Sequence, residues 1–316
     1  MMVDIVIPNY NGESYLKNCI ESVLKQTYTD FRIIVIDNNS TDSLYSWIYD
    51  YKNIIFKRLD KNYGFSKAVN EGIKLSKSKF VVMLNNDTEV DKEWLKNLVE
   101  LITSNKKIFS VSSKMIRYDN KNIIDDAGDE YTLLGWTLKM GDGKSINKFN
   151  KQRLIFSSCA GAAIYRISML EKIGYFDENF FAYMEDVDIS YRALINGYKN
   201  VYCPDAKVYH IGSATSGSKY NSFKVNLSAR NNIYVIYKNM PIVQMIFNSP
   251  FLLVGFLIKY LFFIKCGFGK EYRSGILSAF RQFSEIEKIK FKYRNIFRYI
   301  YIEWLLIINT FKLFKK

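Results

Sequence analysis

Three carboxylates within four residues form the strongest candidate for chemistry in this chain. Glu185, Asp186 and Asp188 stand at the start of an expected helix, directly after the aromatic segment FDENFFAYM, which should pack and hold them in place. One carboxylate in such a position can act as a general base on an acceptor hydroxyl. We assign that role to Asp186, with Glu185 orienting the site or the acceptor. The alternative is structural, because acidic residues at a helix start interact favourably with the helix dipole. Asp188 can also pair with Arg192 one turn later.

Asp87 is the second candidate, because it follows the apolar strand pattern FVVML at the place where parallel sheets bind ligands. Mg²⁺ and Mn²⁺ are hard cations that prefer oxygen ligands, and they commonly bridge a protein carboxylate to substrate phosphates. Such an ion neutralises the charge that develops on a diphosphate leaving group. The run Asn85-Asn86-Asp87-Thr88 is also typical of a helix N-cap, so the residues alone leave both roles open.

Other catalytic classes lack the residues that they need. The chain has one histidine, His210, and neither a GxSxG elbow nor a catalytic cysteine context accompanies it. Four cysteines are scattered without a CxxC pair, which indicates neither a zinc site nor a disulfide framework. No GxGxxG or GxxxxGK[ST] motif follows a strand, so the dehydrogenase and P-loop classes are excluded.

Short apolar strand patterns alternate with helical patterns through the first third of the chain. Strands are expected at residues 3–8, 31–37, 54–59 and 80–84, and helices at residues 14–25, 43–51, 65–76 and 92–103. This alternation predicts an α/β fold with a mostly parallel sheet covered by helices on both faces. The polar clusters that follow three of the strands, residues 9–12, 37–40 and 85–87, should therefore converge at one edge of the sheet.

The rest of the first two thirds is less regular. Residues 109–156 mix strand-like pieces with Gly and Asp, and a helix is expected near residues 168–173. A second helix should begin at Glu185 and stop near Asn196, and a strand-like run covers residues 201–210.

The last third of the chain is basic and aromatic. The 316 residues carry a formal net charge of +14 and 16% aromatic residues, and from Phe223 onward basic residues sit between apolar runs at 242–264 and 296–314. This charge implies an anionic partner unless it is only a compositional bias. Three arrangements stay open for the two runs. They are helices in a membrane interface, helices packed on the catalytic part or across a dimer, and a spanning helix. The interfacial arrangement fits the interrupting polar residues best.

The chain start, MMVDIVIPNY, lacks the basic and apolar regions of a signal peptide. We therefore expect the catalytic part to be cytoplasmic and peripheral at the inner face of the cell membrane. A nucleic-acid partner is not expected, because that reading rests on charge alone, without a recognisable binding motif.

Six segments occur in the order that a known family shows: VDIVIPNYNG, VIDNNSTD, KNYGFSKAVNEG, LNNDTEV, FDENFFAYMEDVDISYR and YCPDAKVYH. Over roughly residues 3–240 the chain resembles family 2 glycosyltransferases of the GT-A fold, above all the rhamnosyltransferase-like branch that builds bacterial surface polysaccharides. The resemblance implies inverting transfer of a sugar from a nucleotide-diphosphate donor, dTDP-rhamnose or a UDP-hexose. The implied acceptor is a saccharide, commonly lipid-linked.

The resemblance also assigns roles to individual residues. The implied donor-binding residues line the nucleoside pocket, border the base and ribose, or approach the donor sugar, and they are Pro8, Asn9, Asn11, Asp37, Asn62, Gly64, Asn86 and Gly161. The DxD metal motif of the family appears as Asn85-Asn86-Asp87, with Asn first as is usual in this branch, so Asp87 is the charged ligand for Mg²⁺ or Mn²⁺. His210 matches a late histidine close to the metal or diphosphate. Glu185 and Asp186 match the motif that holds the catalytic base.

We expect a GT-A catalytic domain at residues 1–222, with a nucleotide-binding half at about 1–105 and an acceptor and catalytic half at about 106–222. A C-terminal helical, basic and aromatic extension should occupy residues 223–316. Two alternatives remain, a catalytically silent sugar-nucleotide-binding scaffold and a nucleotidyltransferase. The second usually has a Gly-rich basic loop after its first strand, and PNYNGES lacks the basic residue. The donor sugar, the acceptor, the linkage and the oligomeric state, a homo-oligomer included, stay open.

Overall fold

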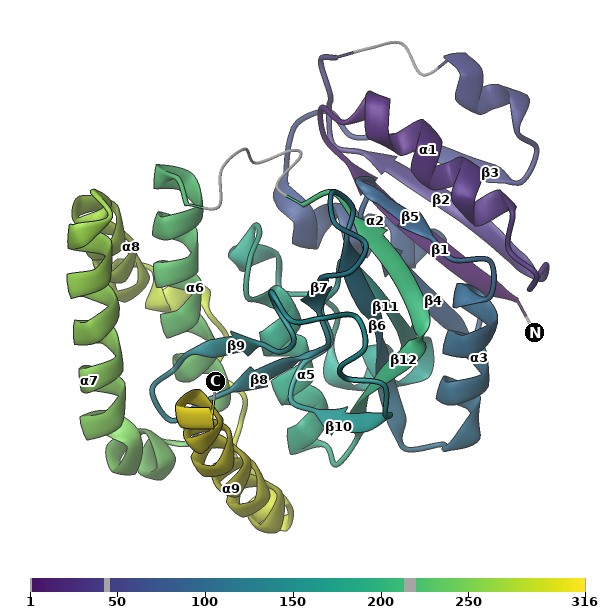
Figure 1. The fold of residues 1–316 in the computed structure, drawn as a ribbon. Coiled ribbons are helices and arrows are strands. Elements are labelled where there is room, and N and C mark those ends of the chain that lie inside the picture. The colour runs from purple at the N-terminus through teal and green to yellow at the C-terminus, as the bar shows by residue number, and fades with distance from the viewer. Residues whose placement is uncertain (1, 43–45, 213–219, 316) are drawn as a thin grey trace.

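A mixed sheet of ten strands forms the centre of the computed structural model, which describes residues 2–42, 46–212 and 220–315 (Figure 1). Eight strands follow one another in the order β10-β12-β6-β11-β4-β1-β2-β3, while β5 pairs with β12 and β7 pairs with β6. These strands are β1 (Val3–Asn9), β2 (Phe31–Asp37), β3 (Ile54–Arg58), β4 (Phe80–Leu84), β5 (Thr88–Val90), β6 (Ile108–Arg117), β7 (Ile124–Asp126), β10 (Arg153–Ile155), β11 (Ala162–Arg166) and β12 (Lys199–His210). A separate hairpin consists of β8 (Asp129–Tyr131) and β9 (Thr137–Lys139).

The strands β4, β1, β2 and β3 run parallel, and the crossover connections between them contain helices at residues 13–24 and 64–75 and a 3₁₀ turn at residues 46–50. In this register Asn9 lies opposite Asp37, and Asp37 lies opposite Arg58. The carboxyl ends of β1 and β2 therefore meet at one edge, beside the end of β4. The polar clusters converge there as the sequence predicts.

Five helices cover the two faces of this sheet. On one face α1 (Glu13–Leu24) and α3 (Trp94–Ser104) pack against the inward side chains of β1 and β4. On the other face lie α2 (Gly64–Leu75), α4 (Ile167–Ile173) and α5 (Glu185–Ile195). The short 3₁₀ turns are η1 (Ser46–Asp50), η2 (Glu178–Phe180), η3 (Phe283–Glu285), η4 (Tyr293–Asn295) and η5 (Leu313–Lys315).

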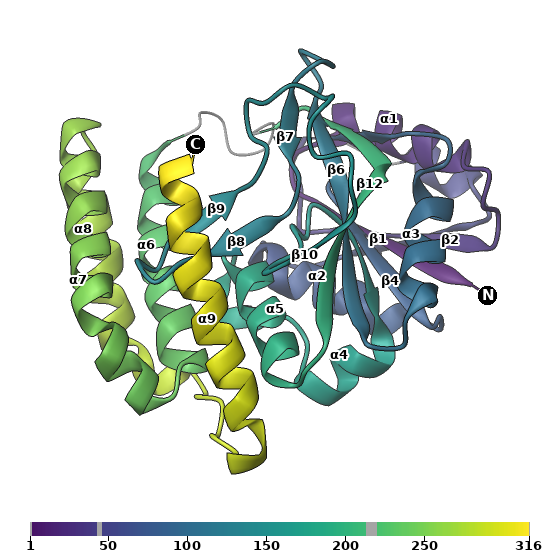
Figure 2. The same cartoon turned by 60° about the horizontal axis from the view of Figure 1, so that its bottom comes forward.

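Four more helices stand beside α5 and the β8–β9 hairpin (Figure 2). They are α6 (Ser222–Asn239), α7 (Ile242–Lys265), α8 (Gly269–Arg281) and α9 (Ile296–Lys312). Residues of α6 and α9 share one hydrophobic core with Tyr131 of β8 and Tyr191 of α5. The C-terminal helices are thus packed directly on the part of the fold that carries the predicted catalytic carboxylates.

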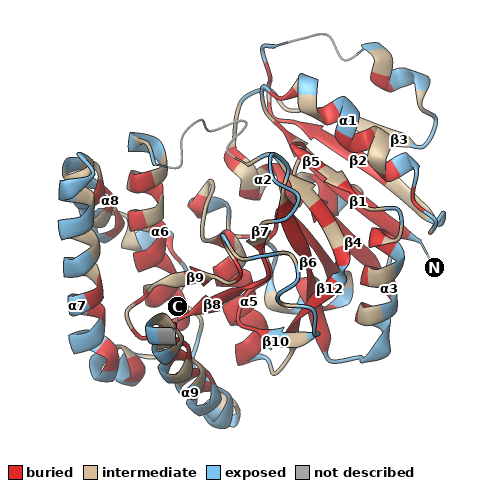
Figure 3. Ribbon diagram, in the orientation of Figure 1, coloured by how far each residue is buried: buried red, intermediate tan, exposed pale blue. Residues whose placement is uncertain are grey.

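The outward faces of α7 and α9 are apolar and exposed to solvent (Figure 3). Phe247 on α7 is 73% exposed and Phe297 on α9 is 81% exposed. A groove of about 1400 Å³ runs between the two helices and is lined mainly by apolar side chains. Among the described helices α7 alone is long and apolar enough, by length and composition, to cross a bilayer.

The predicted fold class is confirmed, with two local differences. Where the sequence predicts a helix at residues 43–51, the described part is only the 3₁₀ turn η1, and residues 43–45 lie outside the described residues. Ile48 is the buried residue of that turn, which is too little apolar surface to support a longer helix. The N-cap alternative for Asp87 is wrong, since β5 follows it and α3 begins only at Trp94. The domain boundaries stay predictions.

Candidate active site

Asn9, Asp37 and Asn86 form one hydrogen-bonded network where β1, β2 and β4 end. The Asn9 amide donates to Asp37 Oδ1 at 3.2 Å, and the Asn86 amide donates to Asn9 Oδ1 at 2.6 Å. Arg58 lies 3.5 Å from the fully buried Asp37 carboxylate and donates to the Ser40 carbonyl at 2.7 Å. The network fixes the loops after three strands relative to one another, which preorganises this edge of the sheet for a ligand.

A second polar network holds the start of α2. The side chain of Asn38 donates to Asn62 Oδ1 at 2.8 Å and accepts from the Tyr63 amide at 2.9 Å. Asn62 Oδ1 also accepts from the Gly64 amide at 2.9 Å. Gly64 has a φ of +82°, and a Cβ there would overlap the carbonyl oxygen of Phe181. Glycine is therefore required, because the segment before α5 passes directly against this position.

Asp87 and His210 face each other across the end of β4 and the end of β12. His210 Nε2 lies 3.4 Å from Asp87 Oδ1, and His210 Nδ1 lies 2.7 Å from Asp125 Oδ2. Burial alone would lower the pKa of His210, but hydrogen bonds to Asp125 and Asp87 raise it to about 9. The predicted pairing of these two residues in one place is thus present, and Asp125 joins them from β7.

The Asp87–His210 pair fits a divalent cation by the chemistry of its donor atoms. A carboxylate oxygen and an imidazole nitrogen converge on one small region, and the other imidazole nitrogen is held by a carboxylate, as is common for metal-binding histidines. No group of three or more His, Cys, Asp or Glu side chains within the described residues is arranged to hold a metal alone. A cation that also binds substrate phosphates needs only one or two protein ligands. The pair therefore suits an ion shared with a diphosphate.

Asp186 lies in the same region, through the loop that precedes β11. The Gly161 carbonyl accepts a hydrogen bond from the Asn85 amide at 2.8 Å, and the neighbouring Ala160 amide lies 3.4 Å from Asp186 Oδ2. This short loop places the catalytic candidate beside the Asn85-Asn86-Asp87 segment. A Cβ at Gly161 would come within 3.0 Å of the side-chain amide nitrogen of Asn85, so the close approach of these two loops depends on glycine at position 161.

The two carboxyl groups of the Glu185-Asp186 pair have different environments. Asp186 is partly exposed, and its Oδ1 accepts a hydrogen bond from the Val187 amide at 2.8 Å. Glu185 is buried, and its Oε2 has no hydrogen-bond partner among the described residues. Burial, followed by repulsion from Asp186 and Asp188, raises the pKa of Glu185 well above its ordinary value. Burial also raises the pKa of Asp186 above its ordinary value. The pair thus consists of one partly exposed carboxyl, Asp186, and one buried carboxyl, Glu185.

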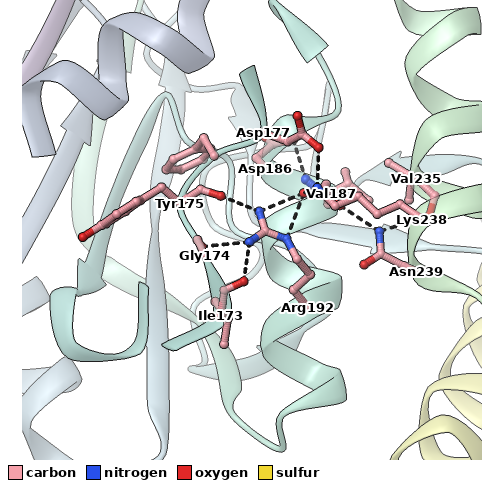
Figure 4. Close-up of polar contacts among 12 residues, drawn as sticks. Ile173, Gly174, Tyr175, Asp177, Asp186, Val187, Arg192, Val235, Lys238 and Asn239 are labelled. Atoms are coloured by element: carbon pink, nitrogen blue, oxygen red, sulfur yellow. Dashed lines mark hydrogen bonds and ion pairs between the residues drawn. The ribbon is translucent and has the colours of Figure 1, made fainter. Parts of the chain in front are cut away.

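A buried ion network fixes the helix that carries Asp186 (Figure 4). Asp188 pairs with Arg192 at 2.8 Å, as the sequence suggests, and with Lys238 of α6 at 3.3 Å. Arg192 also donates to three backbone carbonyls of the loop before α5, at residues 173–175. Met184, just before the helix, has a left-handed φ of +72°. The surrounding contacts hold this strained entry, and strain of this kind is concentrated at functional sites.

Sequence analysis missed a group of charged residues on β7, β8 and β9. Asp126 and Asp129 interact electrostatically with Asp186, Asp125 precedes Asp126 in β7, and Lys139 is the cation among them. Burial raises the pKa of Asp126 to about 6 and that of Asp129 well above its ordinary value. Their region has no regular periodicity in the sequence, so only the repeated Asp residues could have indicated them.

The remaining predicted donor residues lie near the same edge. Asn11, with a φ of +48°, accepts from the Thr41 amide at 2.8 Å through its side chain. Pro8 lies opposite Ile36 one residue before the end of β1. Their assignment to the nucleoside, like that of the other donor residues, stays a prediction.

Solved structures with a similar fold support the class of protein that this sheet defines. A GalNAc-T7 structure containing UDP, GalNAc and Mn²⁺ superposes with a TM-score of 0.62 at 18% identity, over 75% of this chain and 47% of that one. An S. aureus TarS structure gives a TM-score of 0.51 at 18% identity, over 92% of this chain and 94% of that one. The fold is therefore GT-A-like, a mostly parallel sheet with flanking helices.

The chain belongs to glycosyl transferase family 2, whose sequence profile matches residues 4–174. It is 25% identical over 219 residues to the poly-beta-1,6-N-acetyl-D-glucosamine synthase of Staphylococcus epidermidis, covering 68% of this chain and 51% of that protein. It is 24% identical over 226 residues to the O-antigen chain rhamnosyltransferase RfbN of Salmonella typhimurium, covering 71% and 70%. It is 25% identical over 235 residues to the low-salt glycan biosynthesis hexosyltransferase Agl10 of Haloferax volcanii, covering 72% and 73%. The chain spans only about half the length of the first of these relatives.

Proposed function

We propose that this family 2 glycosyltransferase transfers a sugar with inversion from a nucleotide-diphosphate donor to a saccharide acceptor during bacterial surface polysaccharide synthesis. The observation that carries the proposal is the convergence of Asp186 with the Asp87–His210 pair beside the Asn9–Asp37 network. One place on the molecule thus offers a general base, donor atoms for a divalent ion and a polar pocket for a nucleotide.

In this proposal Asp186 takes the proton from the acceptor hydroxyl, because it is the accessible member of the carboxyl pair. Glu185, whose pKa is raised by burial, orients the site. Asp87 and His210 hold Mg²⁺ or Mn²⁺, which when bound neutralises charge on the diphosphate. Asn86 and Gly161 keep the loops around the donor in place, and the networks at Asp37 and Asn62 shape the nucleoside pocket.

The proposed donor is dTDP-rhamnose or a UDP-hexose. Similarity to a rhamnosyltransferase supports dTDP-rhamnose as the donor and supports placement of the chain in the rhamnosyltransferase-like branch. A hexosyltransferase among the relatives and a structural neighbour that contains UDP support a UDP-hexose. The relatives named for polysaccharide, O-antigen and glycan synthesis support a saccharide acceptor, and we propose that it is lipid-linked.

We further propose that the protein is cytoplasmic and binds the inner face of the membrane through its C-terminal helices. Residues 223–316 hold 16 Lys and Arg against 4 Asp and Glu, so this segment carries 12 of the 14 net positive charges. The same segment exposes the apolar faces of α7 and α9. Basic residues beside an exposed apolar face are typical of helices that lie in an anionic membrane interface.

Vesicle sedimentation tests this surface in the full-length chain. Binding to vesicles with anionic phosphatidylglycerol should exceed binding to phosphatidylcholine vesicles and should weaken with salt. Reversing two exposed charges, Lys290→Glu with Lys292→Glu, should weaken binding to the anionic vesicles at least about tenfold, because each cation near the surface contributes about 1 kcal/mol. The matched control reverses Lys25 and Lys52, which are exposed on the nucleotide-binding half. Equal loss in both double variants, or no binding to anionic vesicles, would contradict the proposal.

A donor screen tests the reaction itself. Free nucleoside diphosphate is measured after incubation with dTDP-rhamnose or UDP-hexoses, with and without Mn²⁺ or Mg²⁺. We expect release from one donor, dependent on the cation and abolished in Asp87→Ala. Nucleotide binding without release from any donor would indicate either a missing acceptor or the silent scaffold. Absence of binding by a folded sample would contradict the glycosyltransferase proposal.

A further inference from the structure

We propose that Asp125, itself held by Lys139, is a positioning residue that fixes the His210 imidazole with Nε2 toward Asp87. The inference rests on the proposed function, because it gives His210 a set orientation at the site where that function needs donor atoms for a cation. The three residues come from β7, β9 and β12, which pairwise contacts of the sheet and hairpin bring together.

The geometry assigns a separate oxygen of Asp125 to each neighbour. Asp125 Oδ2 lies 2.7 Å from His210 Nδ1, and Asp125 Oδ1 accepts from Lys139 Nζ at 2.8 Å. With both oxygens engaged, the plane of the carboxylate is fixed. Because Nδ1 is occupied by this carboxylate, Nε2 is the ring nitrogen that faces Asp87 at 3.4 Å. Carboxylates that orient metal-binding histidines in this way set both the tautomer and the ring direction.

Lys139 gives the Asp125 carboxylate a cationic partner. The Lys139 Nζ atom lies 2.8 Å from Asp125 Oδ1. A hydrogen bond between two charged groups is stronger than one between neutral groups. The ammonium group therefore holds the carboxylate in the orientation from which Oδ2 reaches His210 Nδ1.

The single histidine of the chain allows a direct test by NMR with ¹⁵N-labelled histidine, without donor or metal. Among the ring N–H protons of His210, the one at Nδ1 should exchange slowly with water in the wild type. Asp125→Asn keeps the shape of the side chain but removes its charge, so the His210 Nδ1 proton should exchange faster than in the wild type. In Asp125→Ala the Nδ1 proton should no longer be protected from exchange. The matched control is Asp142→Asn, which removes a carboxylate from a surface pair with Arg117 at 2.8 Å. A wild-type Nδ1 proton that exchanges as fast as in Asp125→Ala would overturn the inference.

Binding of Mn²⁺ to the full-length protein gives the second readout, measured by the electron paramagnetic resonance signal of free Mn²⁺. We expect Asp125→Ala to weaken Mn²⁺ binding about 10-fold to 100-fold and Lys139→Met to weaken it less. Unchanged affinity in Asp125→Ala would overturn the inference. A wild type that binds no Mn²⁺ but shows the protected proton would contradict the metal site of the proposed function while supporting the role of Asp125.

Discussion

At the residue scale, the candidate active site combines side chains from two kinds of segment. Asn9, Asp37 and Asp87 lie at or just after the ends of regular strands, whereas Asp125 and Lys139 come from the short strands β7 and β9. Asp87, Asn9 and Asp37 were predicted to meet because the carboxyl ends of parallel strands share an edge, and the structure brings their loops together. Asp125 and Lys139 were not predicted, because they come from an irregular region whose pairing depends on long-range contacts. The burial of Glu185 could not be predicted either, because a run of acidic residues at a helix start does not indicate which carboxyl points into the protein.

Gly64 provides a prediction at this scale, because its backbone conformation and its surroundings both exclude a side chain. Gly64→Ala should reduce the free energy of unfolding by about 3 kcal/mol, from left-handed strain together with overlap on the Phe181 carbonyl. Gly143 is the control, since its φ is +74° but no atom lies within 4 Å of its Cβ position. Gly143→Ala should cost only about 1 kcal/mol in urea unfolding. Equal losses of unfolding free energy in the two variants would show that the Phe181 carbonyl does not restrict a side chain at position 64.

At the element scale, the helices and strands expected from strong periodic patterns match the structure to within a residue or two, whereas α6 and α8 had no residue range of their own among the expectations. The strands at 31–37 and 80–84 match β2 and β4, and the apolar run at 242–264 matches α7. The exception is η1, where capping and turn residues gave a helical pattern without enough buried surface. No local signal in the sequence indicated that α6 and α9 pack against α5. That packing depends on a hydrophobic core shared by residues far apart in the chain.

Helix α5 depends on the ion network of Asp188 for its position. Asp188→Asn should reduce the free energy of unfolding by about 3 kcal/mol at pH 7, because it leaves Arg192 buried without a carboxylate, while Lys238 keeps only Asp177. Burial alone would raise the pKa of Asp188, but these two cations lower it below its ordinary value of 3.8.

A lowered folded-state pKa adds stability above the unfolded-state pKa, and that stability is lost as the pH falls through the folded-state value. Urea unfolding should therefore show a steeper loss below about pH 4 for the wild type than for Asp188→Asn. The exposed Asp50→Asn variant should behave like the wild type. A parallel pH dependence in wild type and Asp188→Asn would contradict the role given to the network.

At the scale of the whole molecule, the β8–β9 hairpin joins the C-terminal helices to the candidate active site. Its tip contacts three of them: the Asn232 amide donates to the Gly135 carbonyl, the Trp136 indole donates to the Gly255 carbonyl, and the Leu133 amide donates to Thr310 Oγ1. Its other end carries Lys139 beside Asp125. The C-terminal helices are therefore part of the structure that supports the site.

Gly255 on α7 tests this connection, because a Cβ there would overlap the carbonyl of Leu134 at the hairpin tip. Alanine is favoured over glycine within a helix by about 1 kcal/mol, yet we expect Gly255→Ala to lower the free energy of unfolding. We also expect faster exchange of the His210 ring proton. Leu253→Ala, at an exposed position of the same helix, is the control and should change neither. A stabilised Gly255→Ala with an unchanged ring proton would show that α7 is not coupled to the site.

The most direct test of the proposed reaction separates nucleotide binding from turnover in Asp186→Asn. Calorimetry with UDP and dTDP in the presence of Mn²⁺ should give the same affinity for the variant and the wild type, because Asp186 acts on the acceptor. Release of nucleoside diphosphate from the active donor should be at least about 100-fold slower in the variant, since the general base is lost. A variant that binds the nucleotide normally and turns over the donor at the wild-type rate would contradict the assignment of Asp186 and with it the proposed mechanism.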